Sequence, residues 1–236
     1  WENFPKNFLI KGVIKIDNYI YLPEKDKQIT SVGFSKKEIK NHKGISGLKY
    51  YLIILYLRKH VQTFGQVALT LNDLLKECGY STNSNNKSIY SDFREIIKTE
   101  IINKGYASCN TDIFVVKPND LFYLQLSYEC NVFFTEDSFV QITISEYEKI
   151  CSLSSKINKS ILLGIYLYIK QYIMDYSGDI APAKISFPSK SQIAKGLDTS
   201  IPTIESGLSI LESHKLIYIR RDMYVENKKE EAIYVP

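Results

Sequence analysis

The chain has 236 residues, a formal net charge of +4 and 44% hydrophobic residues, a composition that is typical of a globular protein and excludes a disordered polar chain. Its most apolar runs begin at Tyr50 and Ile161. They are under half of the ~20 residues that a bilayer-spanning helix needs, which argues against a membrane protein. The length allows two domains of ordinary size, and no secretory signal is visible at the start of the sequence.

The positive charge is concentrated in one part of the chain. Residues 35–118 carry thirteen Lys/Arg against seven Asp/Glu, whereas residues 119–138 carry four acids and no cation. A polyanion-binding surface needs such a cationic excess, because its contacts with phosphates release counterions. A lysine-rich face that is merely solvated explains the same charge equally well, so the charge alone leaves both interpretations open.

The first half of the chain contains four kinds of element in succession. Residues 29–41 are β-prone and lead through a serine into a short helix. Residues 46–60 are apolar around most of their circumference, which is typical of a central core helix. A short helix is predicted over 71–81 and a third helix over 86–105, and the β-prone residues 106–117 follow.

The acidic residues 119–138 come next and include LFYLQLSYECNVFF, which alternates in part. We expect this segment to contribute strands and to form a packed join rather than a free tether.

The second half repeats the order of the first. The matching segments are, in the same order, 139–152, 158–173, 189–200 and 201–219. A hairpin is then predicted over 216–235, with ENKKEE at its tip. We therefore predict an α+β protein with two tandem winged-helix domains, each a three-helix core plus a β-hairpin wing, over residues 1–118 and 139–236, with residues 119–138 as the join.

The second half also carries a resemblance to a known group. LLGIYLYI followed by FPSKSQIAKGLDTSIPTIESGLSILESHKLIYI resembles the helix-turn-helix module of bacterial phage and plasmid replication proteins. The shared features are a proline-serine start, IA on the second helix and a TI…L..L third helix that leads to the wing. A tandem pair of about this length is similar to the two-winged-helix initiators that bind origin repeats, and the resemblance covers most of residues 30–236.

This resemblance implies a sequence-specific double-stranded DNA-binding protein of a plasmid, phage or integrated element. Such a protein would bind repeated origin sites and recruit host replication proteins without catalysis, in the bacterial cytoplasm at the nucleoid or plasmid. A second copy of the chain is a further candidate partner. Transcription regulators share these motifs, so a winged-helix regulator is the closest alternative. A protein-interaction module built on degenerate winged helices is a third.

In the first half, the third helix places cations and polar groups opposite its apolar stripe. The stripe is taken as Ile89, Phe93 and Ile96 at ~100° per residue. The residues expected to contact DNA are Lys87, Ser91, Arg94 and Lys98 on the outward side, Tyr90 on the flank, and Asn85 and Asn86 near the N-terminus of the helix. Amides can pair with adenine edges, and cations with phosphates. The polar face of any amphipathic helix would look similar.

In the second half, the third helix has weaker DNA-reading chemistry. With Ile204, Leu208 and Leu211 as the core, its outward side presents serines, and Glu205 on the flank repels phosphate. The residues expected to contact DNA here are Ser206 and Ser209 on the helix and Arg220, Arg221, Lys228 and Lys229 on the wing. We expect the first half to be the main contact.

Motifs for catalysis, metal binding and nucleotide binding are missing. The sequence has no G-x-x-x-x-G-K-[ST] loop, no His-x-x-x-His pair and no G-x-S-x-G elbow. The four cysteines are scattered without C-x-x-C spacing, as expected of buried thiols. A tyrosine nucleophile would normally need a histidine-rich metal site as well. We therefore expect neither an enzyme nor a bound metal or cofactor.

Overall fold

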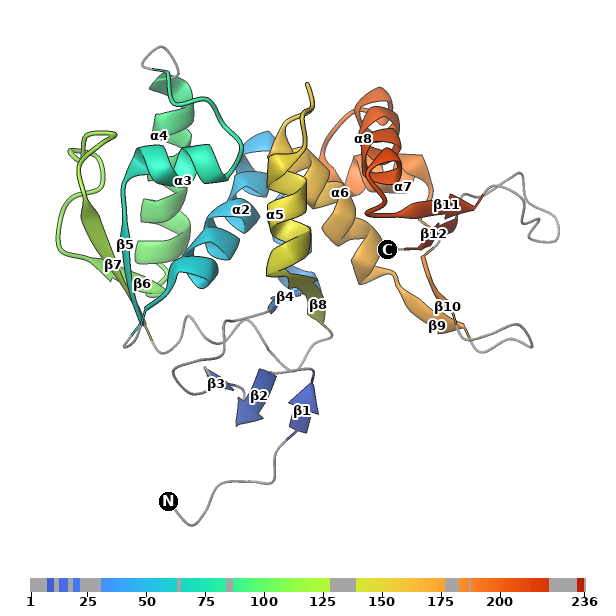
Figure 1. Ribbon diagram of the computed structural model, residues 1–236, viewed down its shortest axis with the longest axis horizontal. Helices are drawn as coiled ribbons and strands as arrows, with labels where there is room; N and C mark the ends of the chain where they lie inside the picture. Colours follow the sequence, from blue (N-terminus) through green and yellow to red (C-terminus); the bar gives the residue numbers. More distant parts are fainter. Residues whose placement is uncertain are drawn as a thin grey trace. The chain divides into compact units, whose positions relative to one another are not determined.

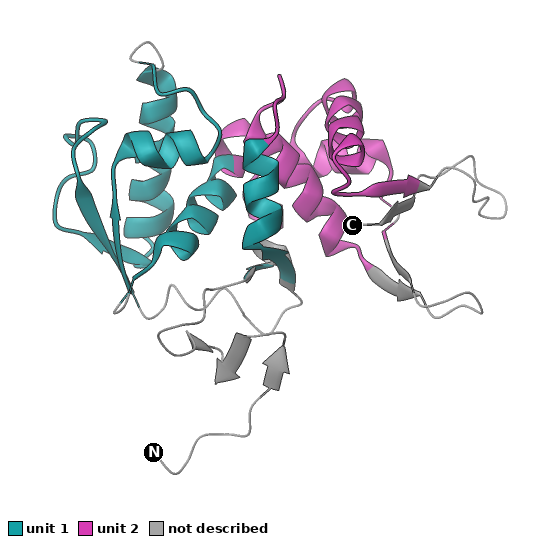
Figure 2. Cartoon of the chain, viewed as in Figure 1, with its two compact units in different colours: residues 1–35, 49–152 teal, residues 36–48, 153–236 magenta. Residues whose placement is uncertain are grey.

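The computed structural model describes residues 8–10, 13–16, 19–21, 31–62, 65–83, 87–127, 139–176, 183–186, 188–220 and 233–235. These residues form helices and small antiparallel sheets (Figure 1), as the predicted α+β class requires. The chain divides into two compact units, one of residues 1–35 with 49–152 and one of residues 36–48 with 153–236 (Figure 2). None of the helices in the described ranges combines the length and the apolar character that crossing a membrane requires.

The first unit is built around helix α2 (Gly44–His60), which contributes its residues from Lys49 onward. Every residue from Tyr50 to Arg58 is buried, as the apolar circumference of the predicted core helix requires. The elements that follow are β5 (Gln66–Leu69), α3 (Leu71–Glu77), α4 (Lys87–Ile96), the π-helix η2 (Ile97–Ile102), β6 (Ala107–Cys109) and β7 (Phe122–Leu126).

Strand β7 lies at the centre of an antiparallel sheet with the order β5-β7-β6. Its residues alternate, since Phe122, Leu124 and Leu126 are buried while Tyr123 and Gln125 are exposed. One face of the sheet therefore covers the core and the other faces outward. Part of the predicted join is thus a strand of the first unit, and residues 128–138 lie outside the described residues.

A second, separate sheet in the first unit was not expected from the sequence. Strands β1 (Phe8–Ile10), β2 (Val13–Ile16) and β3 (Tyr19–Tyr21) form an antiparallel meander.

Two equivalent strand-helix segments have both strands in the first unit but their helices in different units. Strand β4 (Ser31–Ser35) pairs antiparallel with β8 (Phe139–Thr143), and each strand leads directly into a short helix. Helix α1 (Lys36–Asn41), which follows β4, belongs to the second unit, whereas α5 (Ile144–Ser152), which follows β8, belongs to the first. The boundaries expected from the sequence, 1–118 and 139–236, would have placed each helix with the other unit.

Burial accounts for the assignment of α5. The side chains of Tyr147 and Ile150 are fully buried. The Tyr147 hydroxyl lies 3.8 Å from the thiol of Cys78, the residue that directly follows α3. The helix therefore contributes to the core of the first unit.

The second unit is built around helix α6 (Lys159–Gln171), most of which is buried. The elements that follow are β9 (Met174–Tyr176), β10 (Ala183–Ile185), α7 (Lys190–Leu197), α8 (Ile201–Ser213), β11 (Tyr218–Arg220) and β12 (Ile233–Val235). Strands β9 and β10 pair antiparallel, as do β11 and β12, and β10 also lies against β12. The pairing of β11 with β12 agrees with the predicted hairpin, whose tip lies outside the described residues.

Glycines allow α7 and α8 to approach α6 closely. A Cβ on Gly196 of α7 would lie 2.1 Å from the ring of Tyr168, and a Cβ on Gly207 of α8 would lie 2.4 Å from the Ile165 terminal methyl. Between the two helices, Asp198 adopts a left-handed conformation with φ 51° and Ser200 caps α8. Helices α7 and α8 are thus held on α6 by close packing, and the turn between them is set by local turn chemistry.

Candidate nucleic-acid interface

Helix α4 carries most of the residues that the sequence predicts as the main DNA contact. Its buried side is formed by Tyr90, Phe93 and Ile96, and Ile97 extends it into η2. The predicted stripe is therefore wrong at one position, because Ile89 is only half-buried and Tyr90 takes its place.

Tyr90 is buried because its hydroxyl has partners inside the first unit. It donates a hydrogen bond to the side-chain oxygen of Asn72 on α3 and lies 3.1 Å from the carbonyl oxygen of Thr82. A buried tyrosine normally needs such partners. Tyr90 was expected to contact DNA at the surface. It is only 5% exposed, and its ring instead holds α4 against α3.

The other predicted contacts on this helix differ in accessibility. Lys87 and Ser91 are exposed, and Lys98 on η2 is half-buried. Asn85 and Asn86 lie outside the described residues. Of the positions described, Lys87 and Ser91 are therefore the ones that a ligand reaches most directly.

Arg94 is tied to the protein itself. Its guanidinium donates a 2.7 Å hydrogen bond to the carbonyl oxygen of Val116 and lies 6.0 Å from the centre of the Tyr90 ring. Its Nε is buried and has no hydrogen-bond partner within the described residues. In this arrangement Arg94 fastens the connection between β6 and β7 onto α4.

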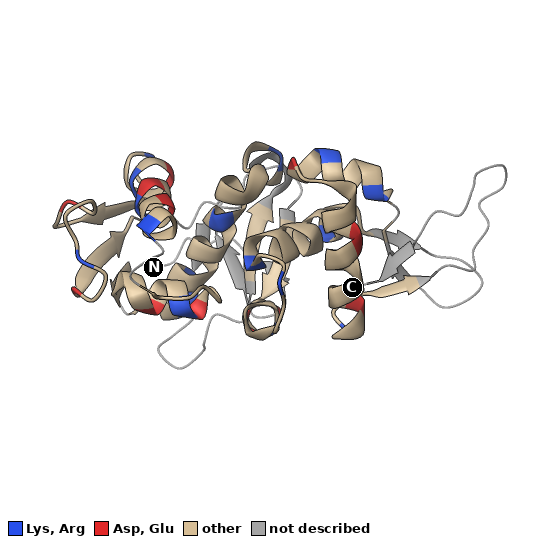
Figure 3. Ribbon diagram, turned by 90° about the horizontal axis from the view of Figure 1, so that it is seen from above, with Lys and Arg blue, Asp and Glu red and all other residues tan. Residues whose placement is uncertain are grey.

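Acidic residues accompany the cations on α4 and η2. Asp92 forms an ion pair with Lys49 of α2, Glu95 is exposed, and Glu100 pairs with Lys104 one turn later. Figure 3 shows cationic and acidic positions interspersed along the helices. The positive charge of residues 35–118 is therefore not gathered on the outward side of α4 alone.

The connection between β6 and β7, residues 110–121, is folded onto α3 and α4 at its base. Asn72 accepts there from the Tyr90 hydroxyl, and its backbone N–H donates to the Pro118 carbonyl at 3.0 Å. At the other end, the Asp112 carboxylate accepts from the Phe114 N–H at 3.1 Å, which shapes a tight turn. Phe114 is exposed at this turn, and Val115 beside it is 69% exposed.

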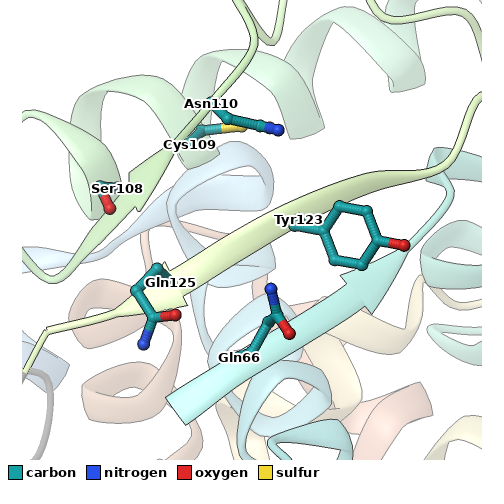
Figure 4. Close-up of a pocket in the computed structure, with 6 residues that line it drawn as sticks. All are labelled: Gln66, Ser108, Cys109, Asn110, Tyr123 and Gln125. Carbon is teal, nitrogen blue, oxygen red and sulfur yellow. The ribbon is translucent and has the colours of Figure 1, made fainter. Parts of the chain in front are cut away.

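A shallow polar hollow lies on the outward face of the β5-β7-β6 sheet (Figure 4). Its volume is about 260 Å³, and its lining residues are Gln66, Ser108, Cys109, Asn110, Tyr123 and Gln125. Figure 4 shows Tyr123 and Gln125 projecting from β7 beside Gln66 of β5. The lining offers amides and hydroxyls but no cation, so it is unsuited to phosphate.

In the second unit, helix α8 has the orientation that the sequence predicts. Ile204, Leu208 and Leu211 are buried, and Ser206 and Ser209 are exposed. The core stripe and its outward serines are thus confirmed. The side chain of Arg220 and the whole of Arg221, Lys228 and Lys229 lie outside the described part of the chain.

Glu205 on α8 has a partner that sequence reasoning missed. Its carboxylate lies 2.8 Å from the Lys190 ammonium group at the start of α7, and both side chains are 49% exposed. The expected repulsion between Glu205 and phosphate is therefore offset by a neighbouring cation. Lys190 directly follows Ser189, the N-cap of α7, so the sequence places the lysine at the start of that helix, but no local sequence signal indicates that Glu205 lies beside it.

The largest pKa shifts belong to the core of the first unit and not to its exposed helices. Burial raises the pKa of the Cys78 thiol well above its usual value, and burial together with Cys78 raises the pKa of the Tyr147 hydroxyl. Both groups therefore stay protonated at neutral pH. A buried neutral thiol is a poor nucleophile, so Cys78 serves packing.

Among the described residues, no group of three or more His, Cys, Asp or Glu side chains could hold a metal ion. The chemistry that the exposed helices offer is hydrogen bonding and charge, through lysines, serines and Lys–Glu pairs.

No protein-family model matches the chain. No curated protein matches it either.

Proposed function

We propose that this chain is a sequence-specific double-stranded DNA-binding protein built on two winged-helix modules. In this proposal it acts without catalysis as a replication initiator-like protein of a plasmid, phage or integrated element, and binds repeated origin sites. The observation that carries the proposal is the element order of the first unit. Helix α2, strand β5, helices α3 and α4, strand β6, a connection and strand β7 follow one another, with the sheet order β5-β7-β6. This order is the one expected of a helix-turn-helix followed by a hairpin wing, and it supports the proposal, although residues 78–86 make a longer connection between α3 and α4 than the usual short turn.

The second unit supports the proposal because its order is similar. Helix α6, strands β9 and β10, helices α7 and α8 and the paired strands β11 and β12 follow in sequence, with β9 as an extra strand that the first unit does not have at this place. Helices α7 and α8 are joined by only three residues, 198–200, and α8 is capped by Ser200. A short turn before a capped helix is typical of a DNA-reading helix-turn-helix.

The accessible side chains are of the kinds that contact DNA. The exposed side chains are Lys87 and Ser91 on α4 and Ser206 and Ser209 on α8. Lysine binds phosphate, and serine hydroxyls bind phosphates and base edges. The origin-binding role comes from the resemblance to replication proteins and not from these side chains.

The test of DNA binding is a fluorescence anisotropy titration of the whole chain with a random pool of labelled duplexes, followed by selection of the bound sequences. We expect affinity to fall steeply between about 50 and 200 mM salt and the selected pool to converge on one motif. Mapping of that motif separates the two roles. Clusters of the motif as origin repeats support replication, whereas single copies at promoters support the transcriptional alternative. Absence of binding at low salt, or binding without convergence, would overturn the proposal.

A protein-interaction module is the second candidate, and two observations favour it. The charges on α4 and η2 are mixed, and Phe114, Val115 and Leu121 expose apolar surface on the β6–β7 connection. If the chain fails to bind DNA but self-associates in sedimentation velocity, and Val115→Asp abolishes that association, the interaction module replaces the DNA-binding proposal.

A further inference from the structure

The ion pair between Lys190 and Glu205 lies where a side chain that contacts DNA bases would lie. Lys190 is the first residue of α7, and Glu205 is in the second turn of α8. Their charged groups are 2.8 Å apart and both are half-exposed. Glu205 adjoins Ser206, so the carboxylate stands beside the exposed serines of the helix that the proposed function assigns to DNA. The N-terminal half of such a helix normally contacts the base edges.

Stability gives little reason for this pair. Exposed ion pairs contribute only marginally, because water screens them and two long side chains lose freedom. Helices α7 and α8 are held instead by buried Ile193, Leu197 and Leu208, and by the close contacts of Gly196 and Gly207 with α6. The turn between them is shaped by Asp198. The packing of α7 and α8 therefore does not depend on the ion pair between Lys190 and Glu205.

The chemistry of a carboxylate on a reading helix is selective. A carboxylate only accepts hydrogen bonds, and the cytosine N4 amino group is a donor exposed in the major groove. Adenine also presents a donor, its N6 amino group, but the adjacent N7 acceptor repels a carboxylate, as do guanine O6 and N7 and thymine O4. A carboxylate near phosphates also needs a cation beside it, and Lys190 supplies one at 2.8 Å.

We propose that Glu205 is a specificity-determining residue that reads the amino group of a cytosine, and that Lys190 is its positioning cation. This inference rests on the proposed function and adds to it one base preference. The DNA site bound by α8 then contains a C·G base pair whose cytosine N4 faces Glu205. Ser206 and Ser209 beside it supply uncharged contacts.

The experiment is selection from a random duplex library with four proteins. These are the parent chain, Glu205→Gln, the exchange Lys190→Glu with Glu205→Lys, and Lys195→Ala as a control on an exposed lysine of α7. The exchange variant keeps an ion pair but reverses which of the two helices carries the positive charge. Thermal melts should show that all four proteins are folded and have similar midpoints. We expect the parent and the control to select the same cytosine. The Gln variant should lose that preference or turn it toward adenine, and the exchange should turn it toward guanine.

The size of the expected change is on the order of tenfold in discrimination at one base pair, with other positions unaltered. If the parent converges on a motif and both Glu205 variants select that same motif with unchanged discrimination, the inference is overturned while the proposed function stands. If the parent converges on no motif, the proposed function fails, and the inference fails with it.

Discussion

The ammonium group of Lys49 on α2 forms an ion pair with the carboxylate of Asp92 on α4, and the Lys49 side chain is only 4% exposed while that of Asp92 is 37% exposed. One partner is therefore buried in the first unit and the other reaches water. The pair connects the core helix with the helix that carries the predicted DNA contacts. Because only one partner is buried, the loss of stability on mutation should differ between Lys49 and Asp92.

Replacing Asp92 should destabilise the first unit more than replacing Lys49. Asp92→Ala leaves the buried ammonium group without its carboxylate, and we expect a loss of about 2–3 kcal/mol. This is below the ~3–5 kcal/mol of fully buried pairs, because Asp92 is partly exposed. Lys49→Met leaves Asp92 free to be hydrated and should cost less than about 1 kcal/mol. Urea denaturation of both variants measures the difference, and equal losses would contradict this account.

Lys87 and Arg94 should have separable roles. Lys87 is exposed, so Lys87→Ala should weaken DNA binding and reduce the salt slope by about one, without a change in melting temperature. Arg94 donates to the Val116 carbonyl, so Arg94→Ala should lower stability by about 1–3 kcal/mol because the carbonyl of a buried residue loses its partner. The measurements are a salt titration of affinity and a thermal melt. Lys104→Ala, which breaks a pair with Glu100, is the control and should leave both nearly unchanged. An Arg94→Ala protein with parental stability would show that the bond to Val116 is unimportant.

Gly196→Ala should destabilise the second unit, whereas Gly207→Ala should be tolerated better. The added methyl at 196 would meet the ring of Tyr168 at 2.1 Å, and a packed aromatic ring cannot rotate away. We expect a net loss of about 1–3 kcal/mol, since overpacking outweighs the higher helix propensity of alanine. At 207 the methyl would meet the Ile165 Cδ1 atom, which a change of side-chain torsion can move. Chemical denaturation compares the two, with Ser209→Ala as an exposed control on α8. A larger loss at 207 than at 196 would contradict the packing described.

The first unit should lose stability as the pH rises above about 8.5. Burial raises the pKa of Cys78, so the folded state keeps its proton at a pH where the unfolded thiol, with an ordinary pKa of about 8.5, has lost it. Stability is then fully present below that pH and declines above it, by up to about 1.4 kcal/mol per pH unit for one group. Cys78→Ala should flatten the dependence of unfolding free energy on pH between about 8 and 9.5.

Tyr147→Phe is the matched control for this experiment. It removes the hydroxyl next to Cys78 but keeps the thiol, and unfolded tyrosine ionises only near pH 10. Its slope between about pH 8 and 9.5 should therefore match the parent's. A parent protein whose stability is constant up to pH 9.5 would show that Cys78 is not held in its neutral form.

Sequence patterns within single helices were enough to identify the central helices and to predict which side of α8 is buried. The central helices α2 and α6 follow from runs that are apolar on all sides, and the buried side of α8 follows from the spacing of Ile204, Leu208 and Leu211. The reason is that a regular helix turns by ~100° per residue, so the identity and spacing of apolar residues are enough to orient it. Capping serines likewise mark the starts of α7 and α8 within a few residues of sequence.

Features that depend on residues far apart in the chain were decided only by the tertiary structure. Tyr90 is buried in place of Ile89 because Asn72 and Thr82 bind its hydroxyl, and nothing within α4 indicates that these partners are near. Glu205 is paired because the turn at Asp198 brings α7 back beside α8. Helices α1 and α5 have similar sequences, yet they belong to different units, because long-range packing decides which core buries an amphipathic helix. The sequence shows that a polar group needs a hydrogen-bonding partner and that an apolar face needs to be buried. Only the tertiary structure shows which residues fulfil these needs.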